Sequence, residues 1–427
     1  MIELRKIPAL ICGVFLSFAS PPLWASFSNE NSIVLGDLAA GMGGAAVAVV
    51  GDSAGAPYYN PATLSFLEGQ AFSAAVGIYK KFDILYGHEE DVTKAPLRLN
   101  QGYFRSLPSS TGSVVRWKHL PDWVLALSVI VPDYEQFKGD LKNDGTNISA
   151  LNYTDESLWV GGSMARKISE SEGVGFSLYY TARNFTRSAS DRQFPAANHT
   201  VQYTNEKSQN ENALVPILGY YNRFNDYWSF GLSVRCPSLK VQGRATLYES
   251  SLNADGGSGT VTVSSLNLSE KAVRVYVPPK ITLGASYRFN PEWMMAADVS
   301  LREGFSYNEI EDGSMISSVK HRALVNGALG VEGFIYDWLK TRVGVYTNFS
   351  SQPNPDPDVS TPQEDHVDML GFSANLVFIA GQKISYTFGG YYTGGHGRSA
   401  QRIDGAYTIV PKTTNVFTML VGTSFSF

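Results

Sequence analysis

The chain has 427 residues, a net charge of -5 and only 17% charged side chains. The negative balance argues against a nucleic-acid partner, and no stretch after residue 26 has the roughly 20 apolar residues that a membrane helix needs. A mean hydropathy of -0.11 still allows a membrane barrel, because the wall of a barrel is apolar only at every second residue.

The first 25 residues have the parts of a secretory signal peptide. Arg5 and Lys6 form a short positive region, and residues 7–19 are mostly apolar. Leu23-Trp24-Ala25 then offers a small residue for cleavage, so we expect an exported mature chain that begins at Ser26.

Residues 26–69 lack the alternation of a barrel strand. Glycine and alanine dominate residues 36–48 (GDLAAGMGGAAVA), and small residues flank Asp52. Small residues permit close backbone packing, and Asn60-Pro61 is expected to turn the chain. We therefore expect a separate, closely packed segment ahead of a barrel that spans residues 70–427.

Beyond residue 69, large apolar residues alternate with small, polar or charged ones. Residues 281–289 (ITLGASYRF) and 370–378 (LGFSANLVF) are two examples. This pattern is typical of strands with one face toward lipid and the other toward a polar lumen. A soluble β-sandwich would carry more Lys and Glu on its solvent face.

The links between the predicted strands alternate in length. The fold class that we predict is all-β, a transmembrane antiparallel barrel of about fourteen strands, at 70–80, 112–119, 122–132, 154–168, 172–186, 209–224, 226–247, 272–289, 292–304, 320–336, 337–349, 365–379, 382–394 and 413–427. Every second link is a short turn, and we expect the other links to be long loops, at 81–111, 133–153, 187–208, 248–271, 305–319, 350–364 and 395–412. Short turns at one end and long loops at the other are typical of an outer-membrane barrel with both chain ends in the periplasm.

The last strand, residues 415–427 (NVFTMLVGTSFSF), supports the same location. Val421, Thr423, Phe425 and Phe427 share one face, and the chain ends on an aromatic residue. This segment resembles the closing strand of bacterial outer-membrane barrels, so we expect the barrel-assembly machinery to bind it.

No motif predicts catalysis, a cofactor or a metal site. Ser109-Ser110 and Ser163 do not lie in a nucleophile elbow. His366, in the sequence EDHVD, could help to hold a cation, but a solvated strand start explains it better. The mature chain keeps only Cys236, which excludes an internal disulfide. The six histidines have no metal-binding spacing: His88, His119, His199, His321, His366 and His396.

The first predicted extracellular loops contain many apolar residues. An exposed apolar cluster usually marks a binding site or a membrane contact. Alternatively, the strands extend beyond the membrane and these residues pack against one another. The candidate ligand-entry residues are Phe82, Ile84, Leu85, Leu97, Leu99, Tyr134 and Phe137.

Residues 41–62 resemble the start of the FadL/TodX-like family, whose members transport long-chain fatty acids or aromatic hydrocarbons. Members begin with a glycine- and alanine-rich plug, followed by an acidic residue among small residues and an aromatic-Asn-Pro-Ala motif. Residues 278–298 and 342–355 resemble two later pieces of the family. Thr63 stands where many members have glycine, so the turn after the motif can differ. The residues that match the plug motif are Asp52, Tyr59, Asn60, Pro61 and Ala62.

The resemblance implies a barrel plugged from the periplasmic side by residues 26–69, which form a hatch. A hydrophobic small molecule would pass from the extracellular loops to an inner pocket and leave sideways into outer-membrane lipid. The opening would lie where an early strand bends inward, and the third predicted strand ends at Pro132, which cannot donate a ladder hydrogen bond. The implied protein is a monomer in the outer membrane of a Gram-negative-type bacterium, with no nucleic-acid partner.

Two other functions stay open at this point. A related barrel could dock secreted or surface proteins without transport, and a general porin could pass small polar solutes. The porin is disfavoured because a plug would block its lumen. A transporter needs an apolar cavity that is continuous from the loops to the wall, whereas a docking barrel could fill its lumen with polar side chains.

Overall fold

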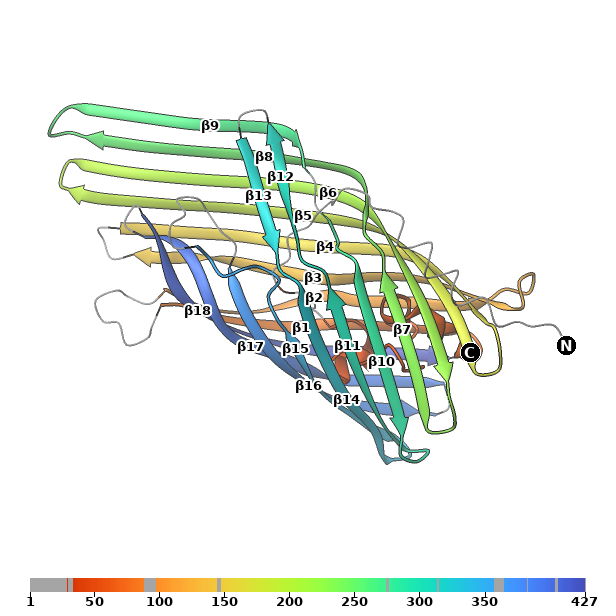
Figure 1. Ribbon diagram of the computed structural model, residues 1–427. Helices are drawn as coiled ribbons and strands as arrows, with labels where there is room; N and C mark the ends of the chain where they lie inside the picture. The colour runs from red at the N-terminus through yellow and green to blue at the C-terminus, as the bar shows by residue number, and fades with distance from the viewer. Residues whose placement is uncertain are drawn as a thin grey trace.

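The computed structural model describes residues 29, 34–87, 97–143, 147–273, 276–312, 315–356, 365–381, 383–403 and 406–426. Fourteen antiparallel strands close into a barrel, which confirms the predicted fold class (Figure 1). None of the helices in these ranges is long and apolar enough to cross a membrane.

The barrel strands follow one another around the wall in chain order, and β1 pairs with β18 to close it. They are β1 (Ala71–Tyr86), β2 (Leu97–Arg116), β3 (Trp123–Asn143), β4 (Asn147–Lys167), β5 (Glu172–Ala196), β6 (His199–Arg223), β7 (Trp228–Arg235), β10 (Lys280–Arg288), β11 (Trp293–Arg302), β14 (Leu324–Tyr336), β15 (Leu339–Asn348), β16 (His366–Ala380), β17 (Ile384–Ile403) and β18 (Ala406–Ser426).

Two hairpins lie beyond the barrel strands, one joined to the sheet of the wall and the other a separate two-stranded sheet. They are β8 (Leu239–Asp255) with β9 (Thr260–Ala272), and β12 (Phe305–Asp312) with β13 (Met315–His321). Strand β8 pairs with the part of β6 that β7 leaves unpaired, so that β9 forms an edge of the sheet. The strands β3 to β6 are therefore much longer than β7, β10, β11 and β14 (Figure 1).

The short turns at one end lie where the sequence predicted them, but most of the segments predicted as long loops are not loops. The segments predicted as loops at 81–111, 133–153, 187–208 and 395–412 are largely strand, and those at 248–271 and 305–319 form mostly the two added hairpins. These segments are rich in Ser, Thr, Asn and Gln. A polar composition predicts contact with water, but a solvated strand satisfies its backbone hydrogen bonds as well as a loop does.

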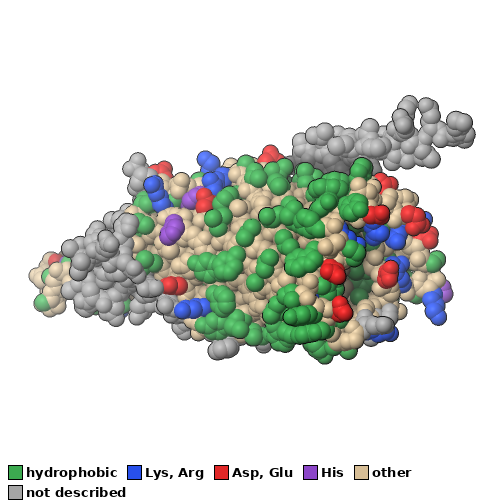
Figure 2. All heavy atoms as spheres, turned by 90° about the horizontal axis from the view of Figure 1, so that it is seen from below, with side chains coloured by type: hydrophobic (Ala, Val, Ile, Leu, Met, Phe, Trp, Pro, Cys, Tyr) green, Lys and Arg blue, Asp and Glu red, His purple; other side chains and the backbone are tan. Residues whose placement is uncertain are grey.

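Outside, the wall is apolar. Leu283, Val299 and Val345 are among many large side chains that are about half exposed, and Figure 2 shows hydrophobic side chains across the middle of one face with charged ones mostly toward its two ends. Aromatic residues gather at the turns. The ring centroids of Trp228 and Tyr287 are 4.7 Å apart there, and those of Trp338 and Tyr336 are 5.8 Å apart. Such a belt is typical of a membrane interface.

Inside the barrel lies the hatch, residues 34–67, with α2 (Asp37–Gly41), α3 (Ala56–Tyr59) and the 3-10 helix η1 (Pro61–Phe66). Helices this short are unstable alone, so the wall must hold them. Wall glycines make the room, because a methyl group on Gly231 would overlap the backbone of Val47, and one on Gly330 or Gly344 would overlap that of Met42.

The end of β18 is testable by truncation. Phe425 pairs with Phe72 of β1, their ring centroids 6.4 Å apart, and with Ile384 of β17. Deleting residues 425–427 removes the ladder partners of Phe72 in β1 and Ile384 in β17. Within the membrane, each backbone group left unsatisfied costs several kcal/mol. We expect a weaker fast-migrating folded band on unboiled gels. Phe425→Leu, which keeps the ladder, is the control, and an unchanged band in the truncated chain would contradict this role.

Candidate functional site

Asn60 is completely buried and joins the hatch to the wall. Its Nδ2 donates to the carbonyl of Val47 at 2.7 Å and to that of Tyr220 in β6 at 2.9 Å, and its Oδ1 accepts from the amide of Ala62 at 3.1 Å. Its extended backbone (φ -159°) separates α3 from η1, as expected of a residue before proline. Both polar atoms of the amide are therefore satisfied, as a buried amide requires.

Three strands further around the wall from β6, Asp298 in β11 holds the next part of the hatch. Its Oδ2 accepts hydrogen bonds from the amides of Ala46 at 2.8 Å and Val47 at 3.0 Å. The hatch carbonyl of Val47 thus bonds to Asn60 while its amide bonds to the wall. Residues 46 and 47 are fixed from both sides.

A buried ion-pair network holds α2. Arg342 in β15 contacts Asp37 Oδ2 at 3.3 Å through Nη1 and Glu332 Oε2 of β14 at 2.6 Å through Nε. Thr387 of β17 also donates to Asp37 Oδ2, at 3.0 Å. Removing one member would leave a buried charge unpaired, which typically costs about 3–5 kcal/mol.

Asp52 uses only one of its carboxylate oxygens, as Asp298 does. Its Oδ1 accepts from the amides of Ala54 at 3.0 Å and Gly55 at 2.9 Å, but its buried Oδ2 has no hydrogen-bond partner within the part of the chain that the structure describes. Burial, reinforced by the carboxylate of Asp37, raises the pKa of Asp52 to about 7. The hatch therefore favours the protonated acid.

An aromatic-rich apolar cluster fills the lumen between the hatch and strands β3 to β6. Tyr58 of the hatch contacts Trp159 edge-on, with ring centroids 5.8 Å apart, and the ring centroids of Trp159 and Tyr179 are 5.7 Å apart. The polar tips are satisfied, since Trp159 Nε1 donates to Ser157 Oγ at 2.6 Å. The buried members of this lumen cluster are Leu35, Tyr58, Ile130, Val131, Tyr134, Trp159, Tyr179, Val215 and Ile217.

A cavity of about 60 Å³ lies on the other side of the hatch, against β7, β10, β11, β14 and β15. Val34, Ala328 and Tyr346 give it apolar walls, and Arg235 and Lys280 place two cations beside them. A cavity that binds benzene measures about 150 Å³. This cavity is therefore too small for even a small aromatic ligand while the hatch is in this position.

The wall is split between β2 and β3 over their outer parts. The ladder between them runs only from Arg116 opposite Val124 to Ser110 opposite Ile130. Beyond it, β2 still pairs with β1 and β3 still pairs with β4. The β3–β4 register shifts between Ile130 and Asp133, around Pro132. The strand bends there, as the proline suggested, but does not end, because β3 continues to Asn143.

The apolar lumen cluster reaches the split. Ile130 forms the last β2–β3 pair, and Val131 and Tyr134 follow it on β3 with buried side chains. The cluster thus connects the hatch to the longest stretch of the described barrel wall where neighbouring barrel strands lose their ladder while both still continue. A shorter interruption lies between β14 and β15, beyond Ala328 opposite Tyr346.

The candidate ligand-entry residues lie on strands, so their predicted place in loops is wrong. Phe82 and Ile84 on β1 and Tyr134 on β3 are buried, not exposed. Leu85 is on the opposite face of β1 from Phe82, since side chains alternate along a strand. The others are on β2 (Leu97 and Leu99) and β3 (Phe137), and their side chains lie outside those that the structure describes.

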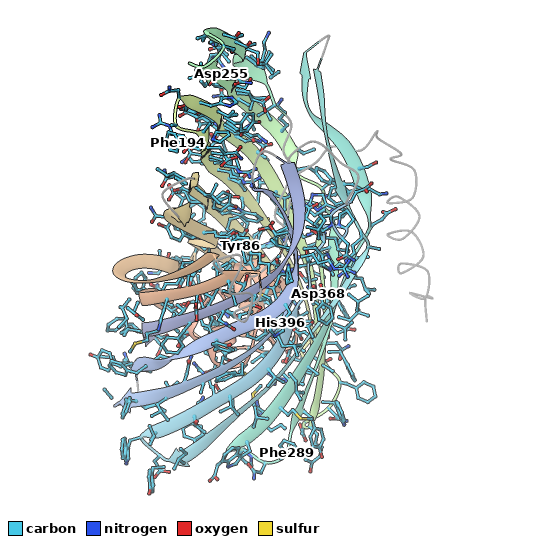
Figure 3. All side chains as sticks on the ribbon, turned by 90° about the vertical axis from the view of Figure 1, so that its left-hand side faces the viewer. Tyr86, Phe194, Asp255, Phe289, Asp368 and His396 are labelled. Atoms are coloured by element: carbon cyan, nitrogen blue, oxygen red, sulfur yellow. The ribbon has the colours of Figure 1, made fainter. Side chains whose placement is uncertain are left out.

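Ile84 helps to close the extracellular end of the lumen. It packs in one buried cluster with Tyr86 of β1 and Leu151 of β4, although β2 and β3 separate these strands in the wall. Figure 3 views the barrel from this end, with Tyr86 labelled. Ile84 thus packs against residues outside the candidate set, and a ligand-entry role for the candidate residues stays a prediction.

Sequence reasoning missed the centre of the lumen cluster. Trp159 and Tyr179 alternate with outward residues and share their face with Ser157 and Ser177. A large aromatic residue on the small, polar face of a barrel strand was the available signal. Among the described residues, which do not include His88, no group of three or more His, Cys, Asp or Glu side chains is placed to hold a metal ion.

No family model matches the sequence, and no curated protein sequence matches it. Solved structures do. A FadL homologue of Pseudomonas aeruginosa is 15% identical, with 93% of this chain and 100% of that chain covered and a TM-score of 0.66. The Pseudomonas putida toluene transporter TodX (14%, 95% and 100% covered, TM-score 0.62) and the Ralstonia pickettii toluene transporter TbuX (15%, 92% and 98%, TM-score 0.55) are also similar. The chain therefore has the fold of FadL/TodX-like outer-membrane barrels.

Asn60→Ala should loosen the hatch while the barrel still assembles. The change removes three hydrogen bonds, each worth about 1 kcal/mol net and more where a partner stays buried and unsatisfied. We expect faster proteolysis within residues 34–67 in the folded barrel. Asn222→Ala, which removes an amide at the periplasmic rim that bonds to Glu172, is the matched control. Equal cleavage of both variants would contradict the anchoring role.

The hatch should be held more tightly at acidic than at alkaline pH. Released into water, Asp52 would titrate near its ordinary pKa of about 3.9, whereas burial raises the pKa to about 7 in the packed hatch. The contribution of Asp52 to the packing is therefore largest below about pH 4 and is lost as the pH rises to about 7. Amide-exchange protection of residues 36–60, compared between pH 5 and pH 8, should fall more in the native chain than in Asp52→Asn. The same fall in both would exclude Asp52 as the cause.

Proposed function

We propose that this protein is an outer-membrane channel through which hydrophobic small molecules diffuse and leave sideways into the membrane. The apolar lumen cluster carries the proposal, because it leads from Leu35 and Tyr58 in the hatch to Ile130 and Tyr134 beside the split. The structures similar to this chain are described as a FadL homologue and toluene transporters, which supports transport of this class of compound.

A lateral path suits the chemistry of such a compound. Moving an alkyl chain into water costs about 0.8 kcal/mol for each methylene, so about ten methylenes would meet a barrier of roughly 8 kcal/mol at the periplasmic end. An exit between β2 and β3 leads into lipid and avoids this cost.

Movement of the hatch is the gating step of the proposal. The hydrogen bonds at Asn60 and Asp298 are individually worth about 1 kcal/mol, which is comparable to what burial of one or two ligand methylenes gains. A ligand that replaces side-chain packing in the lumen can therefore offset the release of a few hatch contacts. No chemical step is needed, so we propose diffusion.

The cavity beside the hatch favours compounds with an acid group. Arg235 donates from Nη1 to the hydroxyl of Tyr58 at 3.5 Å, and Lys280 Nζ lies 5.9 Å from the centre of the same ring. These two cations outnumber the one acid that lines the cavity, Asp298, and next to an aromatic surface they can hold a carboxylate while the alkyl part contacts the ring. We therefore propose fatty acids ahead of neutral aromatic hydrocarbons as ligands.

The remaining parts of the proposal concern processing and assembly. Residues 1–25 would be removed as a signal peptide, and the barrel-assembly machinery would insert a monomeric barrel. A barrel that docks secreted or surface proteins is the second candidate, and it requires no passage of small molecules through the lumen.

Leu35→Asp separates these candidates. Leu35 is buried in the lumen cluster but belongs to the hatch, so a charge there blocks the apolar path without altering the wall. In cells that lack their own channel, we expect the full chain to take up labelled oleate and Leu35→Asp to lose most of that uptake. Leu67→Asp, on the same segment but outside the lumen cluster, is the control. Uptake by the full chain at the level of empty cells would favour docking.

A further inference from the structure

A second apolar site lies outside the barrel, on the lipid-facing wall. It is a groove of about 480 Å³ that crosses β2 to β5. Small-molecule sites typically measure about 300–1,000 Å³, so the groove is large enough for an alkyl chain or a ring. It is lined by Ser113, Val115, Leu125, Leu127, Met164 and Phe176.

Two adjacent rows of cross-strand neighbours form the groove. Val115 of β2, Leu125 of β3 and Met164 of β4 make one row of large side chains. The next row, Ser113, Leu127 and Gly162, is small, large, small. Leu127 is 70% exposed because its neighbours on both sides hardly rise from the backbone. Hollows therefore form beside Leu127.

Gly162 leaves the deepest space. A Cβ added there would meet only the Cδ2 of Leu127, at 3.9 Å, and otherwise open space. Many glycines of the lumen face, by contrast, make room for the hatch or for aromatic rings. No charged side chain lines the groove, so it suits the alkyl or aromatic part of a compound and not its head group.

The groove lies at the foot of the split. From Ser113 toward the split, the next outward-facing pair is Thr111 opposite Val129. The pair after it, Ser110 opposite Ile130, is the last of the β2–β3 ladder. Ser113 is thus three residues, or about 10 Å along the strand, from the point where the wall opens. An apolar compound that emerges between β2 and β3 meets this groove before bulk lipid.

We propose that the groove is an external binding site for the alkyl chain of the compound that leaves through the split. The inference rests on the proposed transport function, which it extends from the lumen to the outer face of the wall. The occupant is the transported compound because the groove adjoins its exit and offers only apolar contacts. The site keeps the compound on the protein while its polar end is still in the lumen.

Photolabelling of the full-length barrel in phospholipid nanodiscs tests the site. The probe is a long-chain fatty acid with a diazirine near the methyl end, and adducts are located by mass spectrometry. We expect adducts concentrated on Leu127, Met164 and Phe176 that unlabelled oleate removes. Gly162→Leu fills the hollow and excludes about two methylenes, which predicts about tenfold less labelling. Ala297→Leu, on the lipid-facing side of β11 far from the split, should change nothing.

Other outcomes distinguish the inference from the function on which it rests. Equal labelling all around the wall, or the same groove adducts from a diazirine phospholipid, would show ordinary lipid in the groove and overturn the inference. Normal oleate uptake with labelling unchanged by Gly162→Leu would overturn it too, but leave the channel intact. No uptake by the folded native chain would refute the proposed function itself.

Discussion

The pairing of backbone hydrogen bonds constrains every other feature of this barrel. Within lipid, each unpaired amide or carbonyl costs several kcal/mol, so a wall must close on itself. Strands β1 and β18 achieve this by pairing along nearly their whole length. The split between β2 and β3 is a departure from the rule, and side chains beside it bond to backbone groups. Lys80 Nζ, which donates to the carbonyl of Tyr134 at 2.8 Å, is one such side chain.

The hatch follows from the same constraint. It contains no helix longer than one or two turns, so most of its backbone groups need partners from the wall. Asn60, Asp298 and Ser373 provide them, the last by accepting from the amide of Gly43 and donating to the carbonyl of Gly41, both at 2.9 Å. These bonds are few and separable, whereas those of the wall form continuous ladders. The structure therefore combines a rigid wall with a plug that single contacts can release.

The sequence predicted the wall well and the lumen poorly. Alternation depends only on which face of a strand meets lipid, so it located the fourteen strands and their short turns. It failed at the extracellular end, where both faces of β5 and β6 are polar and alternation gives no signal, as in Arg192 opposite Gln202. Asn60 was identified through a family motif. Trp159 and Arg342 were missed because their importance depends on what faces them across the lumen, which strand periodicity does not contain.

The central claim is that a hydrophobic compound leaves through the wall between β2 and β3. The most direct test is a structure of the protein in lipid nanodiscs with a fatty acid that carries bromine near the methyl end. We predict bromine density beside Ile130 at the split and in line with the apolar lumen cluster. Bromine density along the barrel axis, past a displaced hatch toward the periplasmic turns, would contradict the account.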